Sequence, residues 1–352
     1  MCPATDSQGN TGHPRNVADT SAECNGTMTS TELDREARMG GRGTVTAERE
    51  IRRISLANFP ARRREITEQL WAAATDIGFF QLVDHGLSAP EVDGAFAAAA
   101  RFFALPDAVK ARCPLDKPRN AGWESRSQVR PSIGTADEKE SFQITRPHMA
   151  GRWPGEVALP HFRATMLGFE ARCRSLAATV LSCFADRMGL PRDFFDAAHD
   201  PAAATYQSTL RLLHYFPVAA EQAGRADLWR AGAHTDFDCL TLLFQRAGQG
   251  GLQVLPGAEA EGQAWTPVPP SDDAITCNIG DMLTRWSGGE LPSNFHRVTA
   301  PGPNDHLGSR YSIAFFAQAN SDVVIQSPTP AYAAITAGDF ILERIRANYA
   351  AR

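Results

Sequence analysis

From about residue 207 onward, the sequence breaks into short β-type segments separated by turns rich in Gly, Pro, Asn and Asp. A close succession of short strands predicts a barrel or a double-sheet jelly roll, because these folds are built from many short strands. The predicted strands cover residues 209–216, 239–245, 251–255, 274–278, 283–286, 294–299, 310–317 and 322–326. We therefore expect a mainly β protein with flanking helices packed on the outside of this core.

The preceding stretch, residues 49–206, combines helices with a few strands. We expect a short strand at 53–56, a helix around Ile66, a buried strand at 79–83 and a second helix that ends near Phe103. A longer helix follows, because apolar residues recur there at intervals of three or four: Phe162, Met166, Phe169, Cys173, Leu176, Val180, Phe184 and Met188. This stripe is predicted to pack into the core.

These patterns divide the chain into four parts. Residues 1–48 are polar, with almost no apolar periodicity, and are predicted to be a flexible tail. Residues 49–206 form the N-terminal helical and strand region, and 207–327 form the β core. Residues 328–352 contain a final helix, expected at about 339–349.

Composition narrows the class of protein. The net charge of −5 argues against nucleic-acid binding, which needs clustered Lys and Arg. Seven cysteines without a CxxC pair disfavour both a disulfide framework and a structural zinc site. The sequence shows neither an apolar run of membrane-helix length nor a signal-peptide pattern. We expect a cytoplasmic protein, a monomer or weak homo-oligomer, whose partner is a small molecule.

His234, Asp236 and His296 form a candidate metal site. His234 and Asp236 are two residues apart at the end of a strand, so their side chains point to the same face. His296 lies in the predicted strand 294–299, which a jelly roll can bring alongside. Two imidazoles and one carboxylate on one face leave further metal positions open, which suits Fe(II) enzymes that activate O₂. A zinc hydrolase with the same ligands is the chemical alternative.

Arg310 and Ser312 point to a specific co-substrate. They are again two residues apart on one face of a predicted strand. A guanidinium can bind a carboxylate through two parallel hydrogen bonds, and the serine hydroxyl can add a third. A 2-oxo dicarboxylic acid fits this pair, because one end can chelate iron while the far carboxylate reaches Arg310.

Taken in order, these motifs resemble the isopenicillin-N-synthase-like branch of the Fe(II)- and 2-oxoglutarate-dependent oxygenases. The resemblance covers about residues 50–348 and rests on Phe79–Gly86, Gly232–Gln245, Gly250–Val254, Asn278–Met282, His296–Val298 and Arg310–Ser312. Within the branch, three segments are most similar to fungal thymine-7-hydroxylase-like members: Glu140–Phe142, Leu210–Tyr215 and Arg285–Ser287.

The resemblance implies a double-stranded β-helix (jelly roll) core, with Fe(II) on the three metal ligands and 2-oxoglutarate on Arg310 and Ser312. It also implies hydroxylation of an unactivated C–H bond, with O₂ consumed and succinate and CO₂ as co-products. Plant members hold the co-substrate with an Asn-x-Tyr-Pro segment, whereas this chain has His214–Pro217. Tyr215 is the candidate for that role here.

Two other activities stay open. An iron oxidase of the same branch, catalysing ring closure or desaturation without 2-oxoglutarate, can retain the Arg310 and Ser312 pair. A non-catalytic binding module could retain the fold alone, although the intact metal ligands disfavour it. Candidate substrates are pyrimidines, cyclic amino acids and secondary metabolites.

Five residues are candidate substrate contacts. Arg211 lies in an otherwise apolar strand and must find a partner, either a substrate carboxylate or carbonyl or an internal acid. Phe237 and Phe316 could enclose a flat or apolar substrate, though ordinary core packing also explains them. Asn120 and Trp123 could belong to a lid formed by residues 114–134.

Two further polar residues are interpreted as structural. His85 follows a buried strand in the N-terminal region, which argues against a fourth metal ligand. Asp281 follows Gly280 in a predicted turn that redirects the chain toward the site, so we do not expect it to act as an acid catalyst.

Overall fold

The computed structural model describes residues 46–128, 136–225, 228–257 and 264–350. The predicted tail, residues 1–48, therefore lies almost entirely outside the described residues. At its end, the Ala47 backbone N–H donates a hydrogen bond to the Trp265 carbonyl oxygen (2.9 Å), which ties this part of the chain to the β core.

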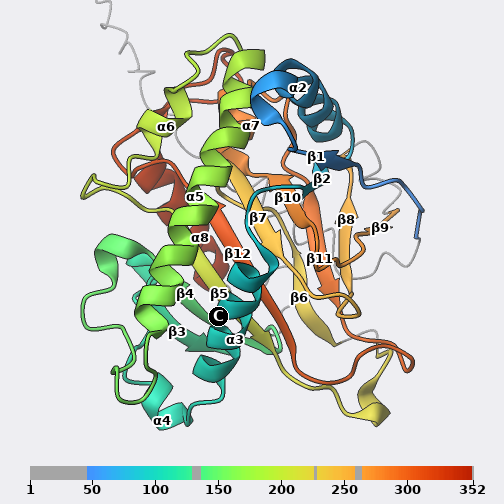
Figure 1. Ribbon diagram of the computed structural model, residues 1–352, viewed down its shortest axis with the longest axis vertical. Coiled ribbons are helices and arrows are strands. Elements are labelled where there is room, and N and C mark those ends of the chain that lie inside the picture. The colour runs from blue at the N-terminus through green and yellow to red at the C-terminus, as the bar shows by residue number, and fades with distance from the viewer. Residues whose placement is uncertain (1–45, 129–135, 226–227, 258–263, 351–352) are drawn as a thin grey trace, which may run out of the picture.

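Two β-sheets form the centre of the molecule (Figure 1). The larger, eight-stranded sheet has the order β1 (Arg53–Ser55), β2 (Phe79–Val83), β10 (Ile275–Ile279), β7 (Leu240–Phe244), β12 (Arg310–Ala317), β5 (Thr209–Tyr215), β4 (Lys139–Ile144), β3 (Gly122–Ser125). The smaller, four-stranded sheet has the order β6 (Trp229–His234), β11 (Phe295–Thr299), β8 (Leu252–Leu255), β9 (Thr266–Pro267). A separate pair joins β13 (Val324–Ile325) and β14 (Ile335–Thr336).

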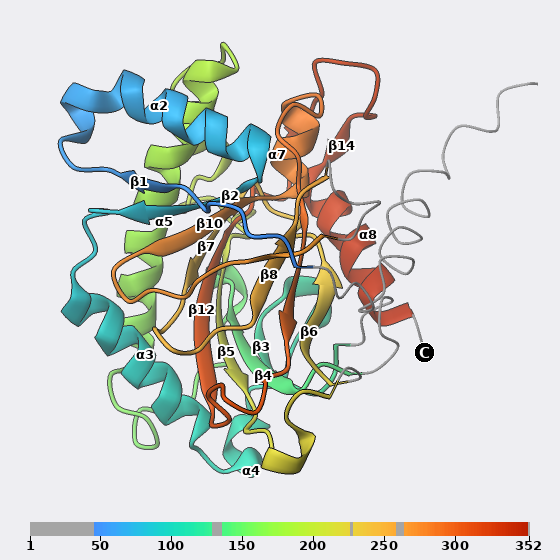
Figure 2. The ribbon, with the colours of Figure 1, turned by 90° about the vertical axis from the view of Figure 1, so that its right-hand side faces the viewer.

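Helices cover the outer face of the larger sheet (Figure 2). They are α2 (Phe59–Asp76), α3 (Ala89–Phe103) and α5 (Phe162–Arg187). Shorter helices are α4 (Asp107–Lys110), α6 (Phe194–Ala198) and α7 (Asp281–Trp286), and the chain continues to α8 (Ala337–Ala350), on the same side as the smaller sheet. The expected mainly β fold with flanking helices is thereby confirmed.

Aromatic packing holds the helices on this outer face. The ring of Phe102 in α3 lies 4.4 Å from that of Phe142 in β4 and 5.4 Å from that of Phe162 in α5, centroid to centroid. The predicted stripe is buried from Phe162 to Phe184, with Met166 and Val180 fully inaccessible to solvent, while Met188, just after α5, is partly buried. The long helix is therefore part of the core, as its apolar spacing predicts.

Strands β5 and β12 present different side chains to the helices on one face and to the smaller sheet on the other. They pair antiparallel, with Arg310 opposite Tyr215 and Ala314 opposite Arg211. Because side chains alternate along a strand, Arg211 and Arg310 share the inner face, which looks toward the smaller sheet. The intervening Leu212 packs into the helix-covered core. The inner face of these two strands therefore carries both arginines.

Two expectations differ from the structure. The predicted strand 283–286 is wrong, because these residues belong to α7. Leu283 and Trp286 are both buried at a spacing of three, and so short an apolar run cannot distinguish helix from strand by its period. The sequence reading also missed β3 and β4, which lie in and beyond the stretch interpreted as a lid.

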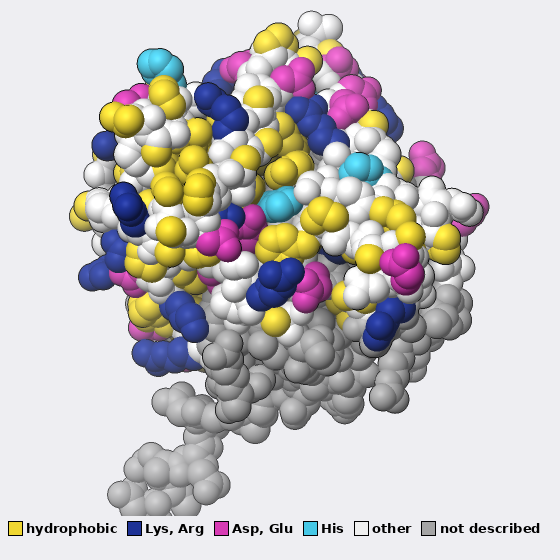
Figure 3. Space-filling model, turned by 90° about the horizontal axis from the view of Figure 1, so that it is seen from below, with side chains coloured by type: hydrophobic (Ala, Val, Ile, Leu, Met, Phe, Trp, Pro, Cys, Tyr) yellow, Lys and Arg dark blue, Asp and Glu magenta, His cyan; other side chains and the backbone are white. Residues whose placement is uncertain are grey.

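The described surface carries charged side chains of both signs. On the face shown in Figure 3, lysine and arginine side chains are interspersed with acidic and hydrophobic ones rather than gathered into one patch. Across the described part of the chain, no helix has the length and apolarity that a membrane crossing requires. The cytoplasmic location and the weak association stay predictions.

Candidate metal centre and adjoining pocket

Strands β6 and β11 bring the three predicted metal ligands together. His234, the last residue of β6, pairs directly with His296 of β11. The Nε2 atom of His234 lies 4.0 Å from Asp236 Oδ1, and Nε2 of His296 lies 3.7 Å from Asp236 Oδ2. One ligand atom from each residue lies within 4.8 Å of the others. Three donors at these separations can share one metal ion.

The main chain orients both imidazoles. Nδ1 of His234 lies 2.7 Å from the carbonyl oxygen of Gly232, and Nδ1 of His296 lies 3.3 Å from that of Asn294. A carbonyl oxygen only accepts hydrogen bonds, so each Nδ1 carries the proton and each Nε2 keeps a lone pair. The backbone thus selects the tautomer that metal binding requires.

Hydrogen bonds also position the carboxylate of Asp236. Its Oδ2 atom accepts from Thr241 Oγ1 (2.7 Å) and from Asn278 Nδ2 (2.8 Å). Thr241 Oγ1 also lies 3.0 Å from Asp238 Oδ2. Burial and then the charge of Asp236 raise the pKa of Asp238 well above its ordinary value. A neutral Asp238 can donate to Thr241, whose single proton is then available to Asp236.

Helix α8 braces the loop that carries the ligands. Arg344 Nη2 donates to Thr235 Oγ1 (2.9 Å) and forms an ion pair with Asp281 Oδ2 (3.1 Å). The Arg344 guanidinium also lies 4.7 Å from the centre of the Phe237 ring. Asp281 is the first residue of α7 and is engaged by Arg344 and Thr235, in keeping with a structural role.

Arg310 and Ser312 are both 1% exposed, on the inner face of β12. Arg310 Nε donates to the Gln249 carbonyl oxygen (3.0 Å), and its guanidinium lies 4.6 Å from the centre of the Tyr215 ring. Arg310 Nη1 and Ser312 Oγ, however, have no hydrogen-bond partner among the described residues. Buried donors without partners are costly, so this pair fits a bound carboxylate.

Arg230 adds a second buried positive charge that the sequence reading missed. Burial, followed by the charge of Arg310, lowers its pKa to about 10. Its Nη2 atom donates to the His306 carbonyl oxygen (3.3 Å), while Nε lacks a partner among the residues described here. An arginine inside the otherwise apolar Trp229–Ala233 segment was the available sequence signal.

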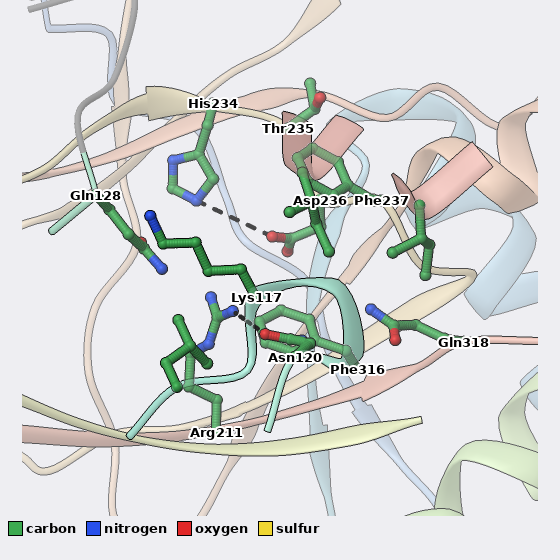
Figure 4. Close-up of a pocket in the computed structure, with 13 residues that line it drawn as sticks. Lys117, Asn120, Gln128, Arg211, His234, Thr235, Asp236, Phe237, Phe316 and Gln318 are labelled. Carbon is green, nitrogen blue, oxygen red and sulfur yellow. Dashed lines mark hydrogen bonds and ion pairs between the residues drawn. The ribbon is translucent and has the colours of Figure 1, made fainter. Parts of the chain in front are cut away.

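A pocket of about 670 Å³, including space open to solvent, adjoins the metal ligands. His234 and Asp236 line one side, and Asn120 and Arg211 line the opposite side (Figure 4). Phe237 and Phe316 also contribute to its walls. The structure therefore brings four of the predicted substrate contacts to one cavity beside the metal ligands.

Trp123 does not join this cavity. It lies on β3 opposite Phe142 of β4, so its side chain is on the helix-covered face of the sheet. There its indole N–H donates to Glu140 Oε2 (2.8 Å). The pleat of β3 thus separates Trp123 from Asn120, which stands in the turn before the strand.

Comparison with protein families agrees with this geometry. Residues 206–319 match the model of the 2OG-Fe(II) oxygenase superfamily, and residues 51–157 match the N-terminal domain model described as non-haem dioxygenase in morphine synthesis. A fungal dioxygenase, citB of Monascus ruber, is 34% identical over 281 residues, covering 74% of this chain and 80% of its own. The chain belongs to the 2OG-Fe(II) oxygenase superfamily.

Other members of this superfamily show the same relationship. The proline hydroxylase buaE of Petromyces alliaceus is 33% identical, covering 79% of this chain and 90% of its own. A crystal structure of a full-length Neurospora crassa protein with α-ketoglutarate and thymine superposes with a TM-score of 0.75 at 29% identity, covering 85% and 97% of the two chains. The protein is thus an Fe(II)- and 2-oxoglutarate-dependent dioxygenase with the double-stranded β-helix fold of its neighbours.

Proposed function

We propose that this dioxygenase hydroxylates an unactivated C–H bond of a small molecule in the pocket beside His234 and Asp236. In this proposal His234, Asp236 and His296 hold Fe(II), and Arg310 and Ser312 hold the far carboxylate of 2-oxoglutarate. The observation that carries it is the pair of buried atoms without partners in the described structure, Arg310 Nη1 and Ser312 Oγ, on the strand that faces the metal-bearing sheet.

Bound Fe(II), 2-oxoglutarate and O₂ supply the oxidising chemistry, with succinate and CO₂ as co-products. The chain contributes binding and orientation. Arg310 and Ser312 offer a charged and a neutral donor, and the ring of Tyr215 supports the guanidinium. Thr241 and Asn278 keep the carboxylate of Asp236 in a fixed orientation.

The pocket walls would select the C–H bond that reacts. Phe237 and Phe316 are partly buried against the core and give the cavity apolar walls that limit water. One relative is named as a proline hydroxylase, and thymine is bound in the Neurospora crassa structure. Proline and thymine are both small molecules, and the pocket beside His234 and Asp236 is where we expect a substrate of that class to bind.

A comparison of two histidine variants tests this proposal. The wild-type protein, made anaerobic and given Fe(II) and 2-oxoglutarate, should develop the visible absorption of an iron-bound 2-oxo acid, and after O₂ is added it should form succinate. His296→Ala should lose both signals. His85→Ala is the matched control, because His85 lies half-buried in a different pocket beside α5.

Two results would contradict the proposal. Substrate oxidation that proceeds without added 2-oxoglutarate would identify the iron oxidase activity instead. Retention of the absorption band and of succinate formation by His296→Ala would remove this residue from the metal site. Folding of each variant is checked by its thermal unfolding midpoint.

A further inference from the structure

Arg211 is a cation for which the described residues provide no acidic partner. Its Nη2 atom makes a long contact with Asn120 Oδ1 (3.4 Å), and its guanidinium lies 5.1 Å from the centre of the Phe316 ring. Its Nε atom is buried without a hydrogen-bond partner in the same part of the chain. The sequence left an internal acid and a substrate group as alternative partners, and the structure described here favours the substrate group.

Arg211 also resembles Arg310 in its surroundings. Both stand on the inner face of the larger sheet, Arg211 opposite Ala314 and Arg310 opposite Tyr215. Each guanidinium lies against an aromatic ring and keeps a buried donor that the described part of the chain leaves unpaired. The two positions are four residues apart along β5, or about 13 Å at the usual rise of a strand. The sheet thus carries two separate arginines with the same kind of surroundings.

The charge of the pocket favours an anion at the second position. Lys117 and Arg211 both line the cavity. Among the described lining residues, Asp236 provides the one carboxylate, and that carboxylate belongs to the metal site. Gln318, a neutral residue, lines a further part of the wall (Figure 4). A carboxylate bound beside Arg211 would therefore meet a cation that has no acidic partner among the described residues.

We infer that the substrate is a small carboxylic acid whose carboxylate binds Arg211, with Asn120 beside it, while its apolar part lies toward Phe237, Ile341 and Ile345. This inference rests on the proposed function, because it places the reacting C–H bond beside the same metal ligands. Arg211 is then the residue that determines substrate class. A neutral pyrimidine would leave the positive charge of Arg211 uncompensated in a half-buried position.

Three probes of similar size test this inference: phenylacetate, its neutral amide phenylacetamide, and thymine. Each is titrated anaerobically into the complex of the full chain with Fe(II) and 2-oxoglutarate, and the change in the visible absorption reports binding. Phenylacetate should bind the wild-type protein more tightly than either neutral probe by about tenfold to a hundredfold, the range for hydrogen bonds to charged groups.

Variants of Arg211 test whether this residue causes the preference for phenylacetate. Arg211→Gln should remove the preference for phenylacetate, and Arg211→Lys should keep part of it, while both retain the absorption of the 2-oxoglutarate complex. Arg126→Gln is the matched control, because Arg126 also stacks on a phenylalanine (Phe216, 4.0 Å) but does not line the pocket.

The possible outcomes distinguish a failure of the proposed function from a failure of the inference about Arg211. If no absorption develops with Fe(II) and 2-oxoglutarate, the proposed function fails before any probe is added. If the absorption develops but thymine or phenylacetamide binds as tightly as phenylacetate, the inference is overturned. It is equally overturned if phenylacetate causes no change, or if Arg211→Gln binds it as the wild type does.

Discussion

On the outer face of the larger sheet, Glu140 accepts hydrogen bonds from Lys110 (2.7 Å) and Trp123 (2.8 Å) and lies 2.8 Å from a ring nitrogen of His214. On the inner face, a few residues away, Arg310 and Ser312 are equally buried but keep atoms without partners in the described structure. The same sheet therefore contains one polar cluster that is satisfied by the protein and one that is not.

This difference between the two polar clusters predicts that one contributes to the stability of the fold and the other to ligand binding. A buried carboxylate that has all its partners helps to specify how α4, β3 and β5 pack, because losing a partner leaves a charge uncompensated. Unpartnered donors contribute nothing to folding and are costly until a ligand binds them. Substitutions on the outer face should therefore reduce stability, and substitutions on the inner face should reduce ligand binding.

The largest effect is expected at the metal site. Asp236→Ala should abolish succinate formation. The decrease should exceed roughly a hundredfold, which is the upper cost of losing a residue that only hydrogen-bonds to a metal ligand. The metal-free protein should lose about 1 to 3 kcal/mol of stability, because Thr241 and Asn278 lose the acceptor of their hydrogen bonds. Chemical denaturation and metal titration of the same preparation check both parts.

On the outer face, Lys110→Met should lower the free energy of unfolding by about 3 kcal/mol, because it removes the cation from the buried Glu140. Turnover per folded molecule should not change. The double variant Lys110→Met with Glu140→Gln should recover part of the loss, since the uncompensated charge is gone. If the double variant is no more stable than Lys110→Met, the uncompensated carboxylate is not the cause.

On the inner face, Arg310→Met should raise KM for 2-oxoglutarate by about tenfold to a hundredfold while leaving the metal-free protein as stable as the wild type or more so. Arg285→Met provides the matched control. Arg285 is also buried and lies against an aromatic ring (Tyr332, 5.4 Å), but none of its atoms is among the buried unpartnered ones in the described residues. Arg285→Met should lower the free energy of unfolding and leave KM for 2-oxoglutarate unchanged. The reverse pattern would refute the distinction between the two faces.

The smallest effect concerns pH. Burial raises the pKa of Glu140, but hydrogen bonds from His214, Lys110 and Trp123 outweigh it, and the net pKa is below the ordinary value. The ionised group therefore stabilises the fold above the unfolded-state pKa of about 4.3, and this contribution is lost as pH falls through the folded-state value. Urea midpoints measured from neutral to acidic pH should fall less steeply for Glu140→Gln than for the wild type. Equal slopes would exclude this contribution.

The sequence could predict the local parts of this architecture. Arg310 and Ser312 are an i and i+2 pair within one strand, so alternation along the strand suffices to place both on one face. His234 ends β6 and Asp236 follows just beyond it, so the two-residue spacing could predict that this pair lies close together. The long helix α5 was predictable because its apolar spacing repeats over many turns. These features need no knowledge of distant contacts.

The parts that depend on tertiary contacts could not be predicted in this way. Trp123 was expected in a lid but lies in β3, because pairing with β4 decides its face. Thr241 and Asn278 meet Asp236 only because β7 and β10 lie side by side in the folded sheet. Helix α7 was taken for a strand because its apolar run is too short to show a helical period.

The contact between Arg344 and Thr235 has a consequence for the order of assembly in the cell. Thr235 stands between two of the proposed metal ligands, and its partner lies on α8, which leaves the ribosome after every strand of the two main sheets. Helix α8 can add its contact to the loop that carries His234 and Asp236 only after it has been synthesised and docked. A nascent chain stalled before α8 would contain all three metal-binding residues while lacking the brace that holds two of them in place.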